Sequence, residues 1–230
     1  MFITRLVDPA IGIPRLAGRT RPALRHVQAG ETEAIADCFR SARTGSDPLV
    51  IAAYRQLEKQ TDRLFAALTD PRGPYRITVI GTCEPAPYRD ARELIASVLS
   101  CRTLEVTRSD ADRAHPLLGS GVGGAYYRFR AVHDLIGHAA TGYGFDPDGE
   151  YSAWLVQRRL YSGLARWAAA TELHGEISAL WTTGQFAEHK AVLLDRHLLN
   201  FLPTVRHSAL CLAISSRSWG TTVNRSPTMP

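Results

Sequence analysis

The chain has 230 residues, a formal net charge of +5 and a hydrophobic fraction of 45%, which is ordinary for a globular protein. This length is sufficient for one large domain with a buried core. No apolar run is long enough to cross a membrane, so we expect a cytoplasmic protein without membrane contact. The arginines are scattered along the sequence, which argues against a nucleic-acid-binding role.

The first half of the chain predicts an irregular arm followed by helices and one strand. Proline and glycine are frequent in residues 1–30, so we predict the arm there, a domain over residues 31–215 and a flexible tail over residues 216–230. Apolar residues at helical spacing predict helices over residues 31–43 and 48–68. In the second of these helices, Asp47 precedes a proline at the first helical position.

Further along, alternating β-branched residues predict a strand over residues 75–80. Asp90 followed by Glu93 resembles a capping box and predicts another helix start. Three more helical stretches are expected, the second of them bent or broken near Gly163 or Gly175: residues 126–140, 150–181 and 186–215. The predicted class is therefore mostly α, with a small strand content, in a single globular domain.

Two histidines five residues apart, His133 and His138, form the most informative motif, because the chain contains only eight histidines. Each neutral imidazole offers a lone pair to zinc, iron or copper. Positions five apart on an α-helix differ by about 140°, so an undisturbed helix does not turn both rings toward one ion. Gly137 allows the backbone to turn or end between them. Asp134 is four residues from His138, so a simple side-chain hydrogen bond on a helix surface is the alternative interpretation.

Three sequence features together resemble the catalytic domain of the pterin-dependent aromatic amino acid hydroxylases, over roughly residues 85–200. They are the run Ala-Arg-Glu-Leu-Ile-Ala at residues 91–96, the motif His-Asp-Leu-Ile-Gly-His at residues 133–138, and Glu176. The resemblance implies the catalytic fold of that family, with Fe(II) held by His133, His138 and Glu176. It also implies a tetrahydropterin cofactor and an aromatic or amino-acid-like substrate, with Arg108 as a loose counterpart of the arginine that binds the substrate carboxylate.

A site of two histidines and one carboxylate leaves iron with open positions for O2 and substrate. We therefore expect a non-haem Fe(II)-dependent monooxygenase acting on a small molecule. Asp134 and Glu172 are candidates to hold the imidazoles by their second nitrogen. His174 and His189 are further candidate ligands, although His174 also fits an exposed or core-edge position.

Three other interpretations remain open at this stage. One is a zinc-dependent hydrolase with the same ligands and a metal-bound water as nucleophile. Another is a site for two iron ions that uses Glu172, Glu176, His189 and one histidine of the motif. The third is a non-enzymatic, α-rich binding protein in which the histidine pair is structural. The sequence is also compatible with a homo-oligomer.

Overall fold

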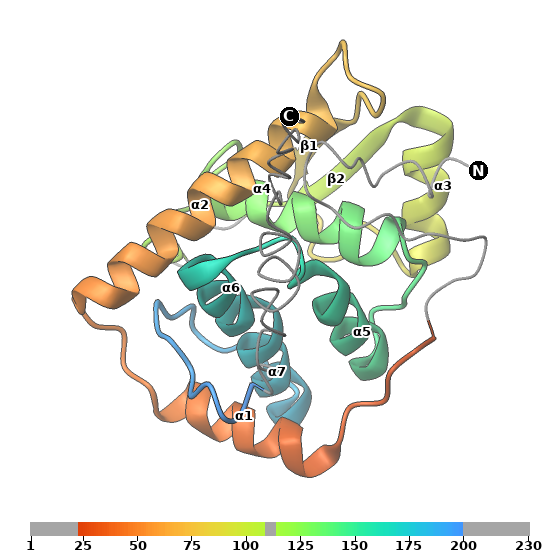
Figure 1. Ribbon diagram of the computed structural model, residues 1–230. Helices are drawn as coiled ribbons and strands as arrows, with labels where there is room; N and C mark the ends of the chain where they lie inside the picture. Colours follow the sequence, from red (N-terminus) through yellow and green to blue (C-terminus); the bar gives the residue numbers. More distant parts are fainter. Residues whose placement is uncertain (1–22, 109–113, 200–230) are drawn as a thin grey trace, which may run out of the picture. The chain divides into compact units, whose positions relative to one another are not determined.

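The computed structural model describes residues 23–108 and 114–199, which belong to one compact unit (Figure 1). Helices make up 54% of the structure and strands 7%, so the predicted class, mostly α with a small strand content, is confirmed. The predicted boundary at residue 215, the tail and most of the N-terminal arm lie outside the described residues. None of the helices in the described ranges is long and apolar enough to cross a membrane.

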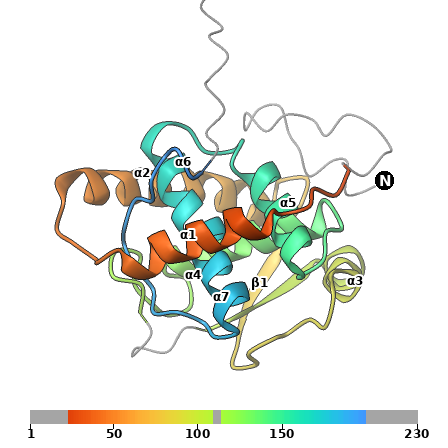
Figure 2. The same ribbon diagram turned by 90° about the horizontal axis from the view of Figure 1, so that it is seen from below.

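The first two helices, α1 (Ala29–Ser41) and α2 (Pro48–Thr69), begin close to their predicted positions. The Asp47 side chain accepts a hydrogen bond of 2.8 Å from the backbone N–H of Leu49, which caps α2 as the sequence predicts. The apolar stripe of α2 is buried: Val50, Ala53, Tyr54, Leu57, Leu64 and Leu68. It packs against α4 and α6, whereas α1 lies across α7 in both views (Figures 1 and 2).

A small parallel sheet follows, in which β1 (Thr78–Thr82) pairs with β2 (Thr103–Thr107). The helix α3 (Ala91–Cys101) connects the two strands. Helix α3 starts at the predicted capping box, where the Asp90 carboxylate accepts from the N–H groups of Arg92 and Glu93. The first strand begins later than predicted because Arg76 adopts a left-handed conformation (φ 53°) that interrupts the extended chain. The second strand was not predicted.

The C-terminal half consists of helices that contain two π-helical segments. Helix α4 (Ala125–Val132) continues directly into the π-helix η4 (His133–Ala139). After α5 (Pro147–Gln157), helix α6 (Gly163–Ala170) continues into the π-helix η5 (Thr171–Gly175) and then α7 (Glu176–Thr183). The predicted long helix is therefore broken before Gly163, whose positive φ of 57° suits glycine.

The helix predicted from residue 186 is wrong over residues 186–199, where the chain is irregular. Side chains from other elements satisfy its backbone carbonyls instead of a helical ladder. Thr171 Oγ1 donates to the carbonyl of Val192 at 2.9 Å, and Trp167 Nε1 donates to that of Leu194 at 2.6 Å. These contacts hold the segment against η5 and α6, near the interior of the unit.

Candidate metal centre

The helical segment that carries the two histidines is wider than an α-helix. In a π-helix each N–H bonds to the carbonyl five residues back, so residues five apart lie above one another. The N–H of Ala140 donates to the carbonyl of Leu135 at 2.9 Å, which is a bond of this type. His133 and His138 therefore lie on the same side of η4. The π-helix, rather than a helix end at Gly137, removes the difficulty of the five-residue spacing.

Gly137 has a different role from the one predicted. A methyl group at this position would lie 3.1 Å from the Cβ of Ala153 and 3.1 Å from Nδ1 of His133. The absence of a side chain thus lets α5 approach η4 closely and leaves room for the His133 ring. The residue positions the site through packing.

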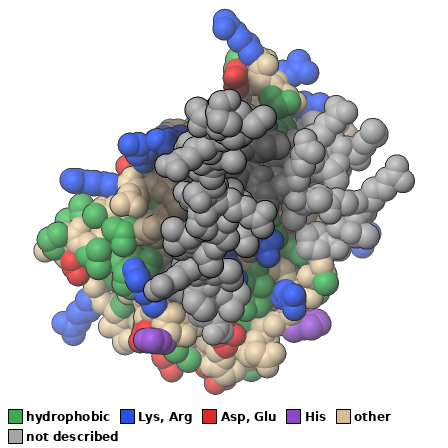
Figure 3. All heavy atoms as spheres, in the orientation of Figure 1, with side chains coloured by type: hydrophobic (Ala, Val, Ile, Leu, Met, Phe, Trp, Pro, Cys, Tyr) green, Lys and Arg blue, Asp and Glu red, His purple; other side chains and the backbone are tan. Residues whose placement is uncertain are grey.

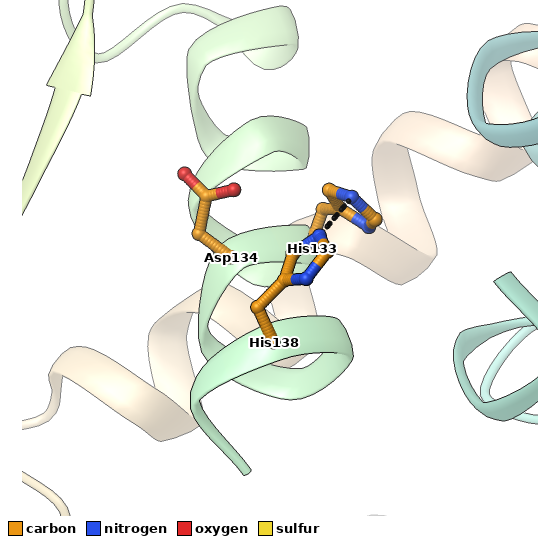
Figure 4. A group of neighbouring side chains, drawn as sticks. All are labelled: His133, Asp134 and His138. Carbon is orange, nitrogen blue, oxygen red and sulfur yellow. Dashed lines mark hydrogen bonds between the residues drawn. The ribbon is translucent and has the colours of Figure 1, made fainter. Parts of the chain in front are cut away.

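Three potential ligand atoms converge between η4 and α5. The two Nε2 atoms, of His133 and His138, lie 3.0 Å apart, and their imidazole rings are turned toward each other in Figure 4. Oε2 of Glu150 lies 3.2 Å from Nε2 of His133 and 3.4 Å from Nε2 of His138. Only 1% of His138 and 9% of Glu150 is exposed, so water competes little with this contact.

The hydrogen-bond partner of each Nδ1 atom determines which ring nitrogen carries the hydrogen. Nδ1 of His133 lies 2.7 Å from Oε1 of Gln157, and Nδ1 of His138 lies 3.2 Å from the backbone carbonyl of Tyr143. Both partners accept hydrogen bonds, so in the neutral rings each Nδ1 donates and each Nε2 keeps a lone pair. Two nitrogen lone pairs and a carboxylate oxygen then face one another with no hydrogen between them. Such a set is stabilised by a bound cation.

The spacing of these atoms fits a metal ion. At a metal–ligand distance of about 2.1 Å, neighbouring ligand atoms lie about 3.0 Å apart in octahedral and about 3.4 Å apart in tetrahedral geometry. The separations of 3.0, 3.2 and 3.4 Å in the structure cover this range. An ion can therefore be accommodated with only small movements of His133, His138 and Glu150.

Without a metal, a proton can supply the positive charge. Burial lowers the pKa of His138, but the charge and hydrogen bond of Glu150 outweigh it, so the pKa is raised overall. Burial raises the pKa of Glu150, but His138 and His133 hold it well below its usual range. Protons and metal ions thus compete for the same lone pairs.

The structure brings Glu150, not the expected Glu176, to the histidine pair. Oε1 of Glu176 lies 3.1 Å from Nδ1 of His189, and among the described residues it forms no hydrogen bond or ion pair with either histidine of the motif. Glu176 opens α7, on a different helix from the one that packs against η4. Glu150 lies in the first turn of α5, whose start at Asp146 and Pro147 is visible in the sequence. That helix start was the signal available for finding it.

Asp134 lies at the edge of the centre without holding the imidazoles. A carboxylate oxygen of Asp134 and one nitrogen of each histidine lie within 4.8 Å of one another, which makes these residues a possible metal-binding group. Figure 4 shows the carboxylate turned away from the facing rings. Glu150 is the better third ligand because its oxygen lies within 3.4 Å of both Nε2 atoms. The role expected of Asp134, fixing the second ring nitrogen, belongs to Gln157 and the Tyr143 carbonyl.

The other candidate residues lie outside the centre. Glu172 accepts hydrogen bonds from Tyr54 and His115 rather than from the histidine pair. His174 is 4% exposed, with Nε2 3.8 Å from Oε1 of Glu31. It is therefore buried, and it lies apart from His133, His138 and Glu150. Arg108 is exposed and donates to the carbonyl of Gly81 at 3.1 Å, so it does not line the centre.

Comparison of the chain with known proteins finds no matching family model, no similar curated protein and no similar solved structure. On the face shown in Figure 3, the visible Lys and Arg side chains lie at separate places rather than in one patch. His133, His138 and Glu150 are therefore the residues whose geometry indicates a function.

Proposed function

We propose that the protein is a non-haem metalloenzyme in which His133, His138 and Glu150 bind one Fe(II) ion, and that it is an O2-dependent hydroxylase of a small molecule. The observation that carries the proposal is the convergence of two Nε2 lone pairs and one carboxylate oxygen within 3.4 Å. This donor set is the facial triad of Fe(II) oxygenases, in which the metal supplies open positions for O2.

The surrounding residues support the same ligand roles. Gln157 and the Tyr143 carbonyl keep the hydrogens on Nδ1, so that both Nε2 atoms are available as donors. Asp146 caps α5 by accepting from the N–H of Gly149 at 3.0 Å and so fixes the helical turn that presents Glu150. The three side chains are thus held by packing and hydrogen bonds between η4 and α5.

A zinc-dependent hydrolase with the same three ligands is the second candidate, and it is favoured by the presence of a further carboxylate, Asp134, with an oxygen within 4.8 Å of a nitrogen of each histidine. A carboxylate near a metal-bound water can accept a proton from that water. Asp134 is half-buried, and burial raises its pKa despite the opposing charge of His133, which suits such a base. The two candidates share the metal site and differ in the metal and its chemistry.

The test begins with protein purified under anaerobic conditions and loaded separately with Fe(II) and Zn(II). O2 consumption is measured with aromatic amino acids and other small aromatic compounds, each with and without tetrahydropterin. The proposal predicts O2 consumption by the Fe(II) form alone, and dependence on tetrahydropterin identifies the electron donor. Hydrolysis of test esters by the Zn(II) form, with no O2 consumption by the Fe(II) form, would favour the hydrolase.

A further inference from the structure

A second group of buried polar side chains lies beside the start of the same continuous helix. Tyr126 on α4 contacts Glu176 and His189, with its hydroxyl oxygen 3.5 Å from Oε2 of Glu176 and 3.4 Å from Nδ1 of His189. Tyr126 and His133 are seven residues apart, so they lie on nearly the same face of the helix, about 10 Å apart along its axis. Tyr126 thus places the second group about two helical turns before the candidate metal centre.

His115, whose ring lies beside those of Tyr126 and His189, also belongs to this group, and both of its ring nitrogens form hydrogen bonds. Nδ1 of His115 accepts from the backbone N–H groups of Leu117 and Leu118 at 3.1 and 2.9 Å, so its hydrogen is on Nε2. That Nε2 donates to Oε1 of Glu172 at 3.2 Å, and Tyr54 donates to the same oxygen. His115 therefore supports the buried Glu172 carboxylate and has no lone pair left to offer.

His189 has the opposite arrangement. Its Nδ1 lies 3.1 Å from a carboxylate oxygen of Glu176, which can only accept, so Nδ1 donates. In the neutral ring the lone pair is then on Nε2, which forms no hydrogen bond with any residue in the described ranges. The side chain is 15% exposed, and the Tyr126 ring packs against the imidazole in a T-shaped arrangement with the ring centroids 4.7 Å apart. A carboxylate thus orients an imidazole whose second nitrogen is accessible.

The charges around His189 come from three other elements. Glu176 and Glu172 face it from α7 and η5, the Arg130 guanidinium acts on it from α4, and the His115 ring lies 6.1 Å away. Burial lowers the pKa of His189 and Arg130 lowers it further, but the hydrogen bond and charge of Glu176, with the charge of Glu172, raise it overall. An imidazolium formed here is stabilised by Glu176.

We propose that His189 and Glu176 form a proton-transfer dyad that acts on an O–H or N–H group of the bound small molecule. Nε2 of His189 accepts the proton as the O–H or N–H bond breaks, and the electron pair of that bond stays on the substrate oxygen or nitrogen. Glu176 keeps the Nδ1 hydrogen in place and stabilises the positive ring, and the proton returns later to product or water. Glu176 is a positioning residue, because it acts through the imidazole.

The first test is a histidine titration by 15N NMR on the full chain without added metal, because nitrogen shifts distinguish the two tautomers. We expect neutral His189 to carry its hydrogen on Nδ1 and to titrate above the usual histidine pKa. In Glu176→Gln the midpoint should move to lower pH, whereas Glu188→Gln, at the exposed neighbouring carboxylate, should leave it nearly unchanged. A hydrogen on Nε2, or an equal midpoint in Glu176→Gln and the parent chain, would overturn the proposal.

The second test measures hydrolysis of p-nitrophenyl acetate, in which Nε2 of His189 would accept a proton from the water that attacks the ester carbonyl as p-nitrophenolate leaves. A chelator is present, so the outcome does not depend on a bound metal. His189→Ala should lose the rate component that follows the titration of His189, and His197→Ala, at an exposed histidine, should retain it. Equal rates in the two variants would overturn the dyad while leaving the metal proposal intact. Circular dichroism of both variants verifies that they are folded.

Discussion

The Nε2 atoms of His133 and His138 lie 3.0 Å apart because the hydrogen-bonding interval of η4 equals the spacing of the two histidines. On a regular α-helix the same residues would point in different directions. The π-helix is thus the local feature that turns a five-residue motif into a pair of facing imidazoles. Single-turn π segments are frequent at functional sites.

Gly137→Ala should disturb this arrangement without altering any ligand. The added methyl group would lie 3.1 Å from Ala153 and from the His133 ring, so we expect a loss of about 1–3 kcal/mol in unfolding free energy and weaker metal binding. Urea denaturation and metal titration measure the two effects. Gly30→Ala is the control, because that site in α1 is open and the free energy should not fall. Similar behaviour of both variants would contradict the packing argument.

Gln157→Leu should weaken metal binding by about 10- to 100-fold, because it removes the acceptor that holds the hydrogen of His133 on Nδ1. Gln60→Leu serves as the matched control. Gln60 bonds to the backbone of Ser162, away from the metal ligands, and its loss should not change the affinity. Competition with a chromogenic chelator provides both dissociation constants. Equal affinities would show that the tautomer of His133 is not set by Gln157.

The pH dependence of stability should change sign when metal binds. In the metal-free protein the raised pKa of His138 stabilises the fold at low pH, and this contribution disappears as the pH rises through the raised value. The depressed pKa of Glu150 stabilises the fold at every pH above the usual glutamate pKa. This stabilisation is lost as the pH falls into strong acid, where the carboxylate is protonated. Metal binding requires neutral imidazoles, so the stabilisation by metal should grow as the pH rises.

Urea unfolding with and without Zn(II), from about pH 5 to about pH 8, covers the range in which histidines titrate. Glu150→Gln should flatten both trends, because the ion pair and the third ligand are removed together. Metal stabilisation that is independent of pH would show that the ion binds elsewhere.

Tyr54→Phe should destabilise the protein by about 1.5–3 kcal/mol, because it removes a hydrogen bond to the buried carboxylate of Glu172. Tyr151→Phe is a suitable control, because the Tyr151 hydroxyl forms no hydrogen bond with a described residue. Thermal or urea unfolding distinguishes the two variants. A loss below about 0.5 kcal/mol for Tyr54→Phe would show that this hydrogen bond contributes little to the stability of the fold.

Features encoded by neighbouring residues could be predicted from the sequence. Asp47 with its proline and Asp90 with Glu93 mark helix starts through short-range hydrogen bonds, and both starts are present in the structure. The irregular path after residue 186 depends on Thr171 and Trp167, which are distant in sequence, and no local pattern reports such contacts.

In the candidate site, too, the part encoded by neighbouring residues could be predicted and the part that depends on distant residues could not. The histidine motif is local and could be found, but the carboxylate that faces it depends on the packing of α5 against η4. Glu176 matched an interval in the sequence, whereas Glu150 is the carboxylate that the fold brings within 3.4 Å of both histidines. His115 and Tyr54 were missed because their only signal is the buried Glu172 that they contact.

The most direct test of the central claim is the metal content of Glu150→Gln and Glu176→Gln, compared with the parent chain after anaerobic loading with Fe(II) and removal of unbound ions. We expect about one iron per chain in the parent chain and in Glu176→Gln, and a large loss in Glu150→Gln, because among the described carboxylates Glu150 is the one with an oxygen within 3.4 Å of both Nε2 atoms. Full iron binding by Glu150→Gln together with loss in Glu176→Gln would contradict the site described here.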